Sequence, residues 1–345
     1  MKNNILIALI TLFITGGNVF GQIGGQNVYR SLNIPGSAQV SAIGGSYMPV
    51  VSNDLEIAIF NPSIIDSMMS DKLSLSYVNY FSDVNLGFAA YAKKIKGRTY
   101  LASIRYFDGG EFNSTDEIGT EIGKFYANDM VLSVGTSFFL DTNWTAGVNA
   151  KMIYSTIEQY SSFGAAIDLS TTYYNPEKRF TFVWIAKNIG YQLTAYHEIK
   201  EQLPFEFQMG FSKQLKHAPF RFSIMYDNVQ QWDLTYSDPN EVISIDPISG
   251  EQIGGRGFPL GDKFMRHIVA GGEILLTENF NIRFGYNYRR RQELKLSTKP
   301  GTAGISWGFG FKIKRFQLNY SRASFHQAGP SNHFTIGTSL AEWKR

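Results

Sequence analysis

From residue 73 to near the end of the chain, apolar and polar side chains alternate at every second position, in runs that each end at a turn. In residues 302–313, every second position carries an apolar side chain, and the positions between them carry Thr, Gly, Ser or Lys. Residues 205–212 and 280–288 show the same alternation. A period of two places the apolar side chains on one face of a β-strand, whereas a helix requires a period of about 3.6. The pattern predicts an all-β chain.

About fourteen stretches have this character, and an even strand number is typical of single-chain bacterial barrels. Most of them carry a continuous apolar stripe rich in Phe, Tyr or Trp. The predicted strands cover residues 73–80, 84–94, 98–108, 130–140, 144–155, 160–174, 179–188, 205–215, 219–229, 265–277, 280–288, 302–313, 315–324 and 333–342.

The connections between these strands tend to alternate between tight turns and longer segments, although two of the expected external connections are short. The longer segments are 109–129, 189–204, 230–264, 289–301 and 325–332. Outer-membrane barrels have short periplasmic turns and longer external loops. If the first strand starts in the periplasm, all five long segments lie outside the cell. The sequence therefore predicts a transmembrane outer-membrane β-barrel over residues 72–345.

A secreted β-sandwich is the alternative fold, because its strands alternate too, but a sandwich buries its apolar face in one limited core. Aromatic residues make up 15% of the chain and charged residues 18%, a composition that suits membrane-facing strands. The formal net charge of +3 gives no reason to expect a nucleic-acid partner. The absence of cysteine excludes disulfides, thiol nucleophiles and a lipoprotein anchor.

The first 71 residues precede the barrel and divide into two predicted segments. Residues 1–21 have the basic start, short apolar run and small residues of a secretory signal peptide. The apolar run 5–14 is too short for a membrane-spanning helix. Residues 22–71 do not alternate cleanly, are too apolar for a flexible tail and contain turn signals. We expect them to fold into the lumen as a hatch, with a periplasmic extension as the alternative.

Candidate chemistry is sparse. The five histidines are scattered, so no nucleophilic triad, metal site or cofactor site is predicted. Arg289, Arg290 and Arg291 form a basic cluster at the predicted external rim, where lipopolysaccharide phosphates or an acidic partner could bind, unless the cluster is only a solvated loop. The loop 230–264 carries apolar side chains that need cover, either from a partner or from the loop itself. Its candidate partner residues are Trp232, Tyr236 and Phe258.

Residues 22–80 resemble the start of the PorQ family, outer-membrane proteins of the Bacteroidetes type IX secretion system. Residues 42–63, AIGGSYMPVVSNDLEIAIFNPS, also resemble the wider FadL and PorV group. In that group a GG turn and an NP turn belong to the luminal hatch, so the resemblance assigns Gly44, Gly45, Asn61 and Pro62 to hatch turns.

The resemblance implies a non-enzymatic anchor in the attachment complex at the cell surface. In this family the barrel pairs with the surface protein PorZ beside PorU and PorV, and PorU links secreted cargo to lipopolysaccharide. No catalytic residue is carried over from the family. Two alternatives remain at this point: a FadL-like transporter of hydrophobic compounds, and a PorV-like shuttle for secreted cargo.

Overall fold

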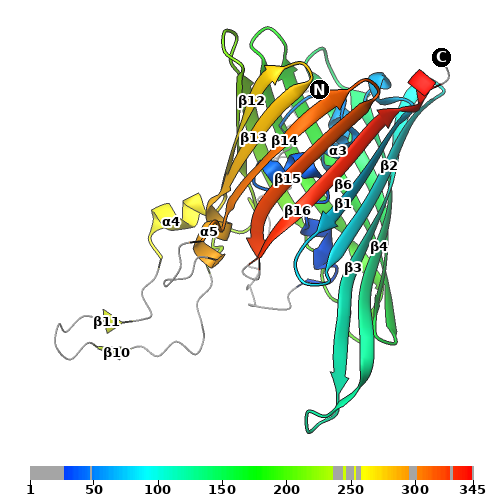
Figure 1. The fold of residues 1–345 in the computed structure, drawn as a ribbon, viewed down its shortest axis with the longest axis vertical. Coiled ribbons are helices and arrows are strands. Elements are labelled where there is room, and N and C mark those ends of the chain that lie inside the picture. The colour runs from blue at the N-terminus through cyan, green and yellow to red at the C-terminus, as the bar shows by residue number, and fades with distance from the viewer. Residues whose placement is uncertain are drawn as a thin grey trace, which may run out of the picture.

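The computed structural model describes residues 27–46, 49–235, 244–245, 252–253, 258–294, 301–326 and 329–343. Fourteen antiparallel strands close into one barrel, with β1 paired to β16 (Figure 1). The predicted signal peptide lies outside the described residues. The predicted all-β barrel, its strand number and its luminal hatch are confirmed.

The barrel strands agree closely with the predicted ones. They are β1 (Lys72–Asn79), β2 (Asn85–Ile95), β3 (Arg98–Thr115), β4 (Glu121–Phe139), β5 (Trp144–Ile157), β6 (Tyr160–Asn175), β7 (Phe180–Thr194), β8 (Glu206–Gln214), β9 (Phe220–Tyr226), β12 (Ile268–Thr277), β13 (Phe280–Asn287), β14 (Ile305–Ile313), β15 (Phe316–His326) and β16 (Gly329–Ser339). A separate two-stranded sheet consists of β10 (Ser244–Ile245) and β11 (Gln252–Ile253).

The helical elements are short. Before the barrel come η1 (Arg30–Asn33), α2 (Ala38–Ala42), α3 (Leu55–Phe60), η2 (Pro62–Ile64) and η3 (Ser67–Met69), and later in the chain α4 (Leu260–Met265), α5 (Tyr288–Leu294) and η4 (Leu340–Trp343). Within the described residues, no helix has the length and apolar character needed to cross a membrane.

Most large apolar side chains of the strands face outward, and most residues that face the lumen are small or polar, except where an apolar wall residue such as Phe88 packs against the hatch. On β14, Ile305 and Trp307 are exposed on the outer surface, whereas Ser306 and Gly308 are buried inside. The outer surface therefore faces lipid, because apolar side chains can contact the hydrocarbon core of a bilayer without an unfavourable change in free energy. Short turns join the strands at one end, and α4, α5 and long connections lie at the other (Figure 1). We assign the first end to the periplasm and the second to the cell exterior.

The prediction of two external loops, at 109–129 and 325–332, is wrong. The segment 109–129 is not a loop, because β3 continues to Thr115 and β4 begins at Glu121. The two strands extend beyond the barrel wall as a hairpin that projects from the external end (Figure 1). We call residues 109–127 the external hairpin. The segment 325–332 belongs mostly to β15 and β16.

The core of the molecule lies inside the barrel, where residues 27–46 and 49–71 fill the lumen as the hatch. Ile43, Ile57, Ile65 and Met69 of the hatch are almost fully buried. They belong to a cluster that also includes wall residues such as Phe88. Burial of these side chains against the wall supplies the hydrophobic part of the hatch's stability.

Candidate functional site

The hatch runs through the lumen from the external mouth to the periplasmic end. Its first described residues meet an external loop, where the Val28 amide donates to the Gln202 carbonyl oxygen at 3.0 Å. Further on, the Ser63 amide donates to Ser170 Oγ of β6 at 2.9 Å. The hatch ends at η3, directly before β1 begins on the periplasmic side. An external loop therefore holds the start of the hatch through backbone atoms, and a polar side chain of the wall holds it further along.

The GG turn lies against the wall at β13. Gly44 and Gly45 both have a φ of 89°, in the left-handed region that favours glycine. The Gly44 amide donates to Ser306 Oγ at 2.9 Å, and Asn287 Nδ2 donates to the Gly44 carbonyl oxygen at 3.3 Å. A Cβ atom added to Gly285 of β13 would lie 2.2 Å from the Gly44 amide nitrogen. The two backbones thus touch, and only a glycine in the wall allows it.

The NP turn has a similar seat on the opposite wall. Asn61 is fully buried; its Oδ1 accepts from Ser63 Oγ at 2.6 Å, and its Nδ2 donates to Thr172 Oγ1 at 3.0 Å. Pro62 begins η2 and lies over Gly147, where an added Cβ would be 2.2 Å from the Pro62 carbonyl carbon. Both predicted turns are therefore points where the hatch is fixed to the barrel.

Between these two points the wall carries a line of charge. A bulge in β7 places two successive residues, Lys187 and Asn188, on the lumen side opposite Asp168. Lys151 Nζ lies 2.6 Å from Asp168 Oδ2 and donates to Asn188 Oδ1 at 2.9 Å. Lys187 Nζ lies 2.8 Å from Glu206 Oε2. The bulge thus lets two lysines reach two carboxylates in one short stretch of wall.

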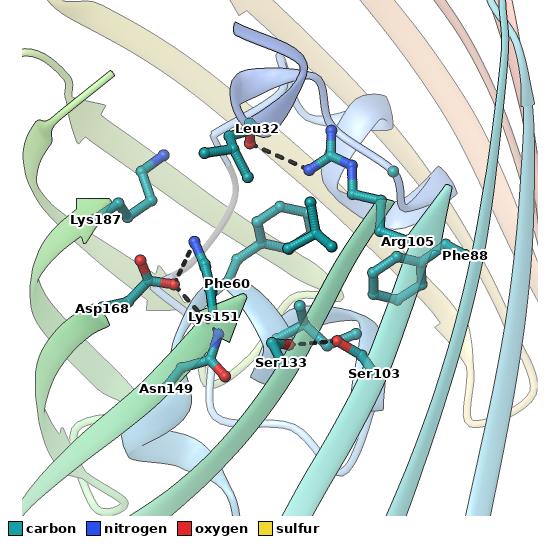
Figure 2. A pocket seen from close by; sticks show the side chains of 13 residues that line it. Leu32, Phe60, Phe88, Ser103, Arg105, Ser133, Asn149, Lys151, Asp168 and Lys187 are labelled. Atoms are coloured by element: carbon teal, nitrogen blue, oxygen red, sulfur yellow. Dashed lines mark hydrogen bonds and ion pairs between the residues drawn. The ribbon is translucent and has the colours of Figure 1, made fainter. Parts of the chain in front are cut away.

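An inner cavity of about 40 Å³ lies between this charged wall and the hatch. On the hatch side, Leu32 and Phe60 point into it, and on the wall side Asp168 and Lys151 face them (Figure 2). The volume holds about three water molecules. It is too small for a benzene-sized solute, which occupies a cavity of roughly 150 Å³.

A larger vestibule of about 390 Å³ opens at the external mouth. Aromatic and aliphatic side chains dominate its lining, and Asp129 supplies a carboxylate. A space of this size accommodates a small organic molecule. Its other lining residues are Tyr29, Arg30, Ser31, Ile34, Phe107, Ala127, Ile157 and Tyr196.

The turn η1 separates the vestibule from the inner cavity. Ser31 and Ile34 line the vestibule, and Leu32 lines the cavity. Arg105 of β3 holds this turn, because its guanidinium donates to the carbonyl oxygens of Ser31, of Leu32 at 3.2 Å and of Ile34 at 2.6 Å. Arg105 is 8% exposed and also lines the inner cavity (Figure 2). Arg105 thus bonds three backbone carbonyl oxygens at this turn, while Asp129 and Asn188 bond the side chains of Ser31 and Asn33. The role of Arg105 could not be predicted from the sequence, because an alternating strand gives no sign of which polar residue meets the hatch.

Two of the three predicted partner residues of the external loop lie in the described part of the chain. Trp232 is 52% exposed and packs on the ring of His267 at 5.9 Å between centroids. Phe258 is 36% exposed and lies 4.8 Å from the Arg266 guanidinium. Tyr236 lies outside the described residues. Part of the loop thus packs on itself, which was one of the two expectations for it.

The three arginines of the basic cluster point to different partners. Arg289 Nε lies 4.0 Å from Glu293 Oε1, and Arg291 donates to the Gly301 carbonyl oxygen. The Arg290 guanidinium lies 3.6 Å from the centre of the Phe325 ring. Binding to lipopolysaccharide by this cluster remains a prediction.

A buried carboxyl group holds the hatch next to the GG turn. Asp227 follows β9 directly, and its Oδ2 accepts a hydrogen bond from Ser46 Oγ. Burial, reinforced by the neighbouring charge of Glu206, raises the pKa of Asp227 to about 7, against the opposing effect of Lys187 and Arg289. The seated hatch therefore binds a proton more tightly than the released hatch does.

We expect the GG turn to open more readily as the pH rises from about 4 to about 7, and to change little above that range. The reason is that a carboxyl whose pKa is raised in the seated state loses its stabilising effect as the pH rises toward that pKa. Amide hydrogen exchange at residues 43–46, corrected for the intrinsic exchange rate, measures the opening of the GG turn between pH 5 and pH 8. Asp227→Asn should flatten the curve; an unchanged slope in this variant would exclude Asp227 as the titrating group.

The described residues hold no group of three or more His, Cys, Asp or Glu side chains that could bind a metal ion. Two of the five histidines are fully buried, and both are hydrogen-bonded. His267 Nδ1 lies 2.7 Å from the Asp227 carbonyl oxygen, and His333 Nδ1 lies 3.0 Å from Ser41 Oγ. Their placement gives them structural roles.

Comparison with known proteins identifies the fold. No family model and no curated protein matches the chain. Among solved structures, it is similar to the deltaS2 mutant of the TodX monoaromatic hydrocarbon channel, with a TM-score of 0.52 and 13% identity over 88% of this chain and 97% of that chain. The chain shares the barrel fold of this channel.

Two further solved structures have lower scores. The Pseudomonas putida toluene transporter TodX gives a TM-score of 0.49 at 12% identity, over 87% of this chain and 96% of that chain. A Pseudomonas aeruginosa FadL homologue gives 0.45 at 11% identity, over 88% of this chain and 98% of that chain. At such identities the likeness concerns the fold alone. The likeness gives no support for membership of the PorQ family or for a role in type IX secretion.

Proposed function

We propose that this chain is an outer-membrane channel, not an enzyme, which admits small molecules with an apolar or aromatic body. The observation that carries the proposal is the pair of spaces on the two sides of η1, with Arg105 holding the turn between them. This is the FadL-like alternative, and similar structures described as a monoaromatic hydrocarbon channel and a toluene transporter support it more than they support an anchor.

The sizes of the two spaces define the step that limits entry. A solute the size of benzene fits the vestibule of about 390 Å³ but not the inner cavity of about 40 Å³. Passage therefore requires η1 to move away from Arg105, and the three hydrogen bonds from that guanidinium contribute to the cost of the movement. Leu32 and Phe60 would move with the hatch and enlarge the cavity.

The test is uptake of radiolabelled toluene by cells of a host without such a channel, producing either the wild-type chain or Arg105→Ala. We expect the wild type to raise uptake above the host level. The variant loses all three hydrogen bonds from the guanidinium. Even one charged hydrogen bond is worth about 1.5 kcal/mol, so opening should be faster by about tenfold or more. Arg98→Ala, at the periplasmic start of the same strand, is the control. Uptake at the host level in both wild type and variant would refute the channel.

A second candidate function is the surface anchor that the resemblance to type IX secretion proteins implies, with a PorZ-like partner. The observation that favours it is the external hairpin, which projects from the barrel although it contributes nothing to closing the wall (Figure 1). The fixed hatch also suits a barrel whose lumen stays closed. In this proposal the external loop around Trp232 and Phe258 contacts the partner.

A further inference from the structure

The external hairpin has two free strand edges. β2 pairs with β3 only as far as Asp108, and β5 pairs with β4 only from Ala127 onward. Beyond these residues, the segments 111–115 and 121–125 pair only with each other among the described strands. Each segment thus presents unpaired backbone N–H and C=O groups along its outer edge.

The hairpin is ordered by its own contacts. Phe112 and Phe125 stack across the two strands with ring centroids 5.2 Å apart. Lys124 Nζ lies 2.5 Å from Glu111 Oε1 on the other face. At the tip, Asp116 Oδ1 accepts hydrogen bonds from two backbone amides. An isolated two-stranded hairpin is only marginally stable in water, so these contacts preorganise a surface instead of leaving a loop.

This surface is apolar and acidic. Ile118 is 88% exposed, Ile122 is 67% exposed, and Phe112 and Tyr126 are also largely uncovered. Residues 109–127 contain four carboxylates and one lysine, a formal charge of −3. The charge disfavours contact with lipopolysaccharide phosphates, because like charges repel. It favours a cationic occupant.

We propose that the external hairpin binds an extended segment of a cell-surface protein, rich in lysine or arginine and with interspersed apolar residues, which adds as a strand to a free edge. Backbone hydrogen bonds to the edge supply affinity, and alternate side chains of the segment contact Phe112 or Ile122. The acidic residues orient the segment and accelerate its association. The inference rests on the anchor candidate in one respect only: it requires an external protein partner.

The experiment places the photo-reactive residue p-benzoylphenylalanine at Phe112 in the full chain, in native outer membranes of the source cells. A second sample carries it at Trp232, and a control at Tyr100 on the lipid-facing side of the same strand. We expect one discrete protein adduct from Phe112, none from Tyr100, and a cross-linked peptide that maps to a basic, extended segment.

Charge reversal supplies the second readout. Glu117→Lys at the hairpin tip should reduce the Phe112 adduct by about fivefold, corresponding to about 1 kcal/mol. Glu177→Lys, the same change in a periplasmic turn, should leave it unchanged. Adducts with lipid only, with a second copy of this chain, or of equal yield after charge reversal would overturn the inference. An adduct from Trp232 without one from Phe112 would refute the hairpin site and keep the anchor; absence of both would refute both.

Discussion

Replacing Gly285 by valine is expected to unseat the hatch and turn the closed barrel into an open pore. Gly285 faces the lumen from β13, and a Cβ there would lie 2.2 Å from the Gly44 nitrogen and 2.3 Å from the Ile43 carbonyl carbon. Both are backbone atoms, so no side-chain rotation relieves the contact. Valine suits a strand, hence the wall should keep its pairing while the hatch moves. Overpacking of this kind costs about 3 kcal/mol or more.

Single-channel conductance in planar bilayers measures the result. The wild type should be closed most of the time, and Gly285→Val should show a stable open level. Gly272→Val is the matched control, because Gly272 lies on the neighbouring strand β12 with no atom within 4 Å of an added Cβ. Gly147→Val gives an independent contact with the hatch at Pro62. Assembled protein with a closed lumen in both luminal variants would contradict the seating described here.

The fourteen strands could be predicted because lipid on one side and lumen on the other impose a period of two. On β14 the alternation of Trp307 and Gly308 records both environments in adjacent residues. The external hairpin was missed because both of its faces contact water, and the alternation disappears where the lipid ends. The stacked pair Phe112 and Phe125 was the available signal, but their pairing depends on a register that the sequence does not give.

The hatch turns could be predicted from their glycines, asparagine and proline, but the wall residues that contact these turns could not. Gly44 binds Ser306 across 262 positions of sequence, and nothing near Gly285 in the chain indicates what lies above it. The role of Arg105 could not be predicted for the same reason. Its partners are backbone carbonyl oxygens at η1, and such contacts leave no pattern in the sequence. The grouping of Arg289, Arg290 and Arg291 suggested one basic patch, but the sequence did not indicate their separate contacts with Glu293, Phe325 and Gly301.

Glu273→Ala is expected to destabilise the barrel more than any other single charge removal. Glu273 lies on the lumen side of β12, directly opposite Arg221 on β9 and Arg283 on β13. Its two carboxylate oxygens lie 2.7 Å from Arg221 Nη1 and 2.8 Å from Arg283 Nε. Glu273 and Arg283 are almost fully buried, so removing the carboxylate takes the acid partner from a buried guanidinium and one acid contact from Arg221. The cost of such an uncompensated charge is about 3–5 kcal/mol.

Arg283 also connects this group of three charged side chains to the hatch. Arg283 Nη1 donates to Asn319 Oδ1 at 3.1 Å, and Asn319 Nδ2 donates to Glu56 Oε1 of α3 at 3.3 Å. Gly310 on the intervening strand leaves the room for this reach, since an added Cβ would lie 2.5 Å from Asn319 Oδ1. Glu273→Ala should therefore loosen α3 as well as the wall.

Urea unfolding of the protein in lipid vesicles measures the loss, and Glu278→Ala in the adjacent periplasmic turn should stay within about 0.5 kcal/mol of the wild type. Replacing all three charges, with Arg221→Met, Glu273→Leu and Arg283→Met, should recover most of the stability, because apolar groups of similar volume often replace a buried ion triad without loss. The recovery separates the cost of unpaired charge from the cost of lost packing. A triple variant as unstable as Glu273→Ala would show that the triad stabilises the barrel beyond neutralising its own charges.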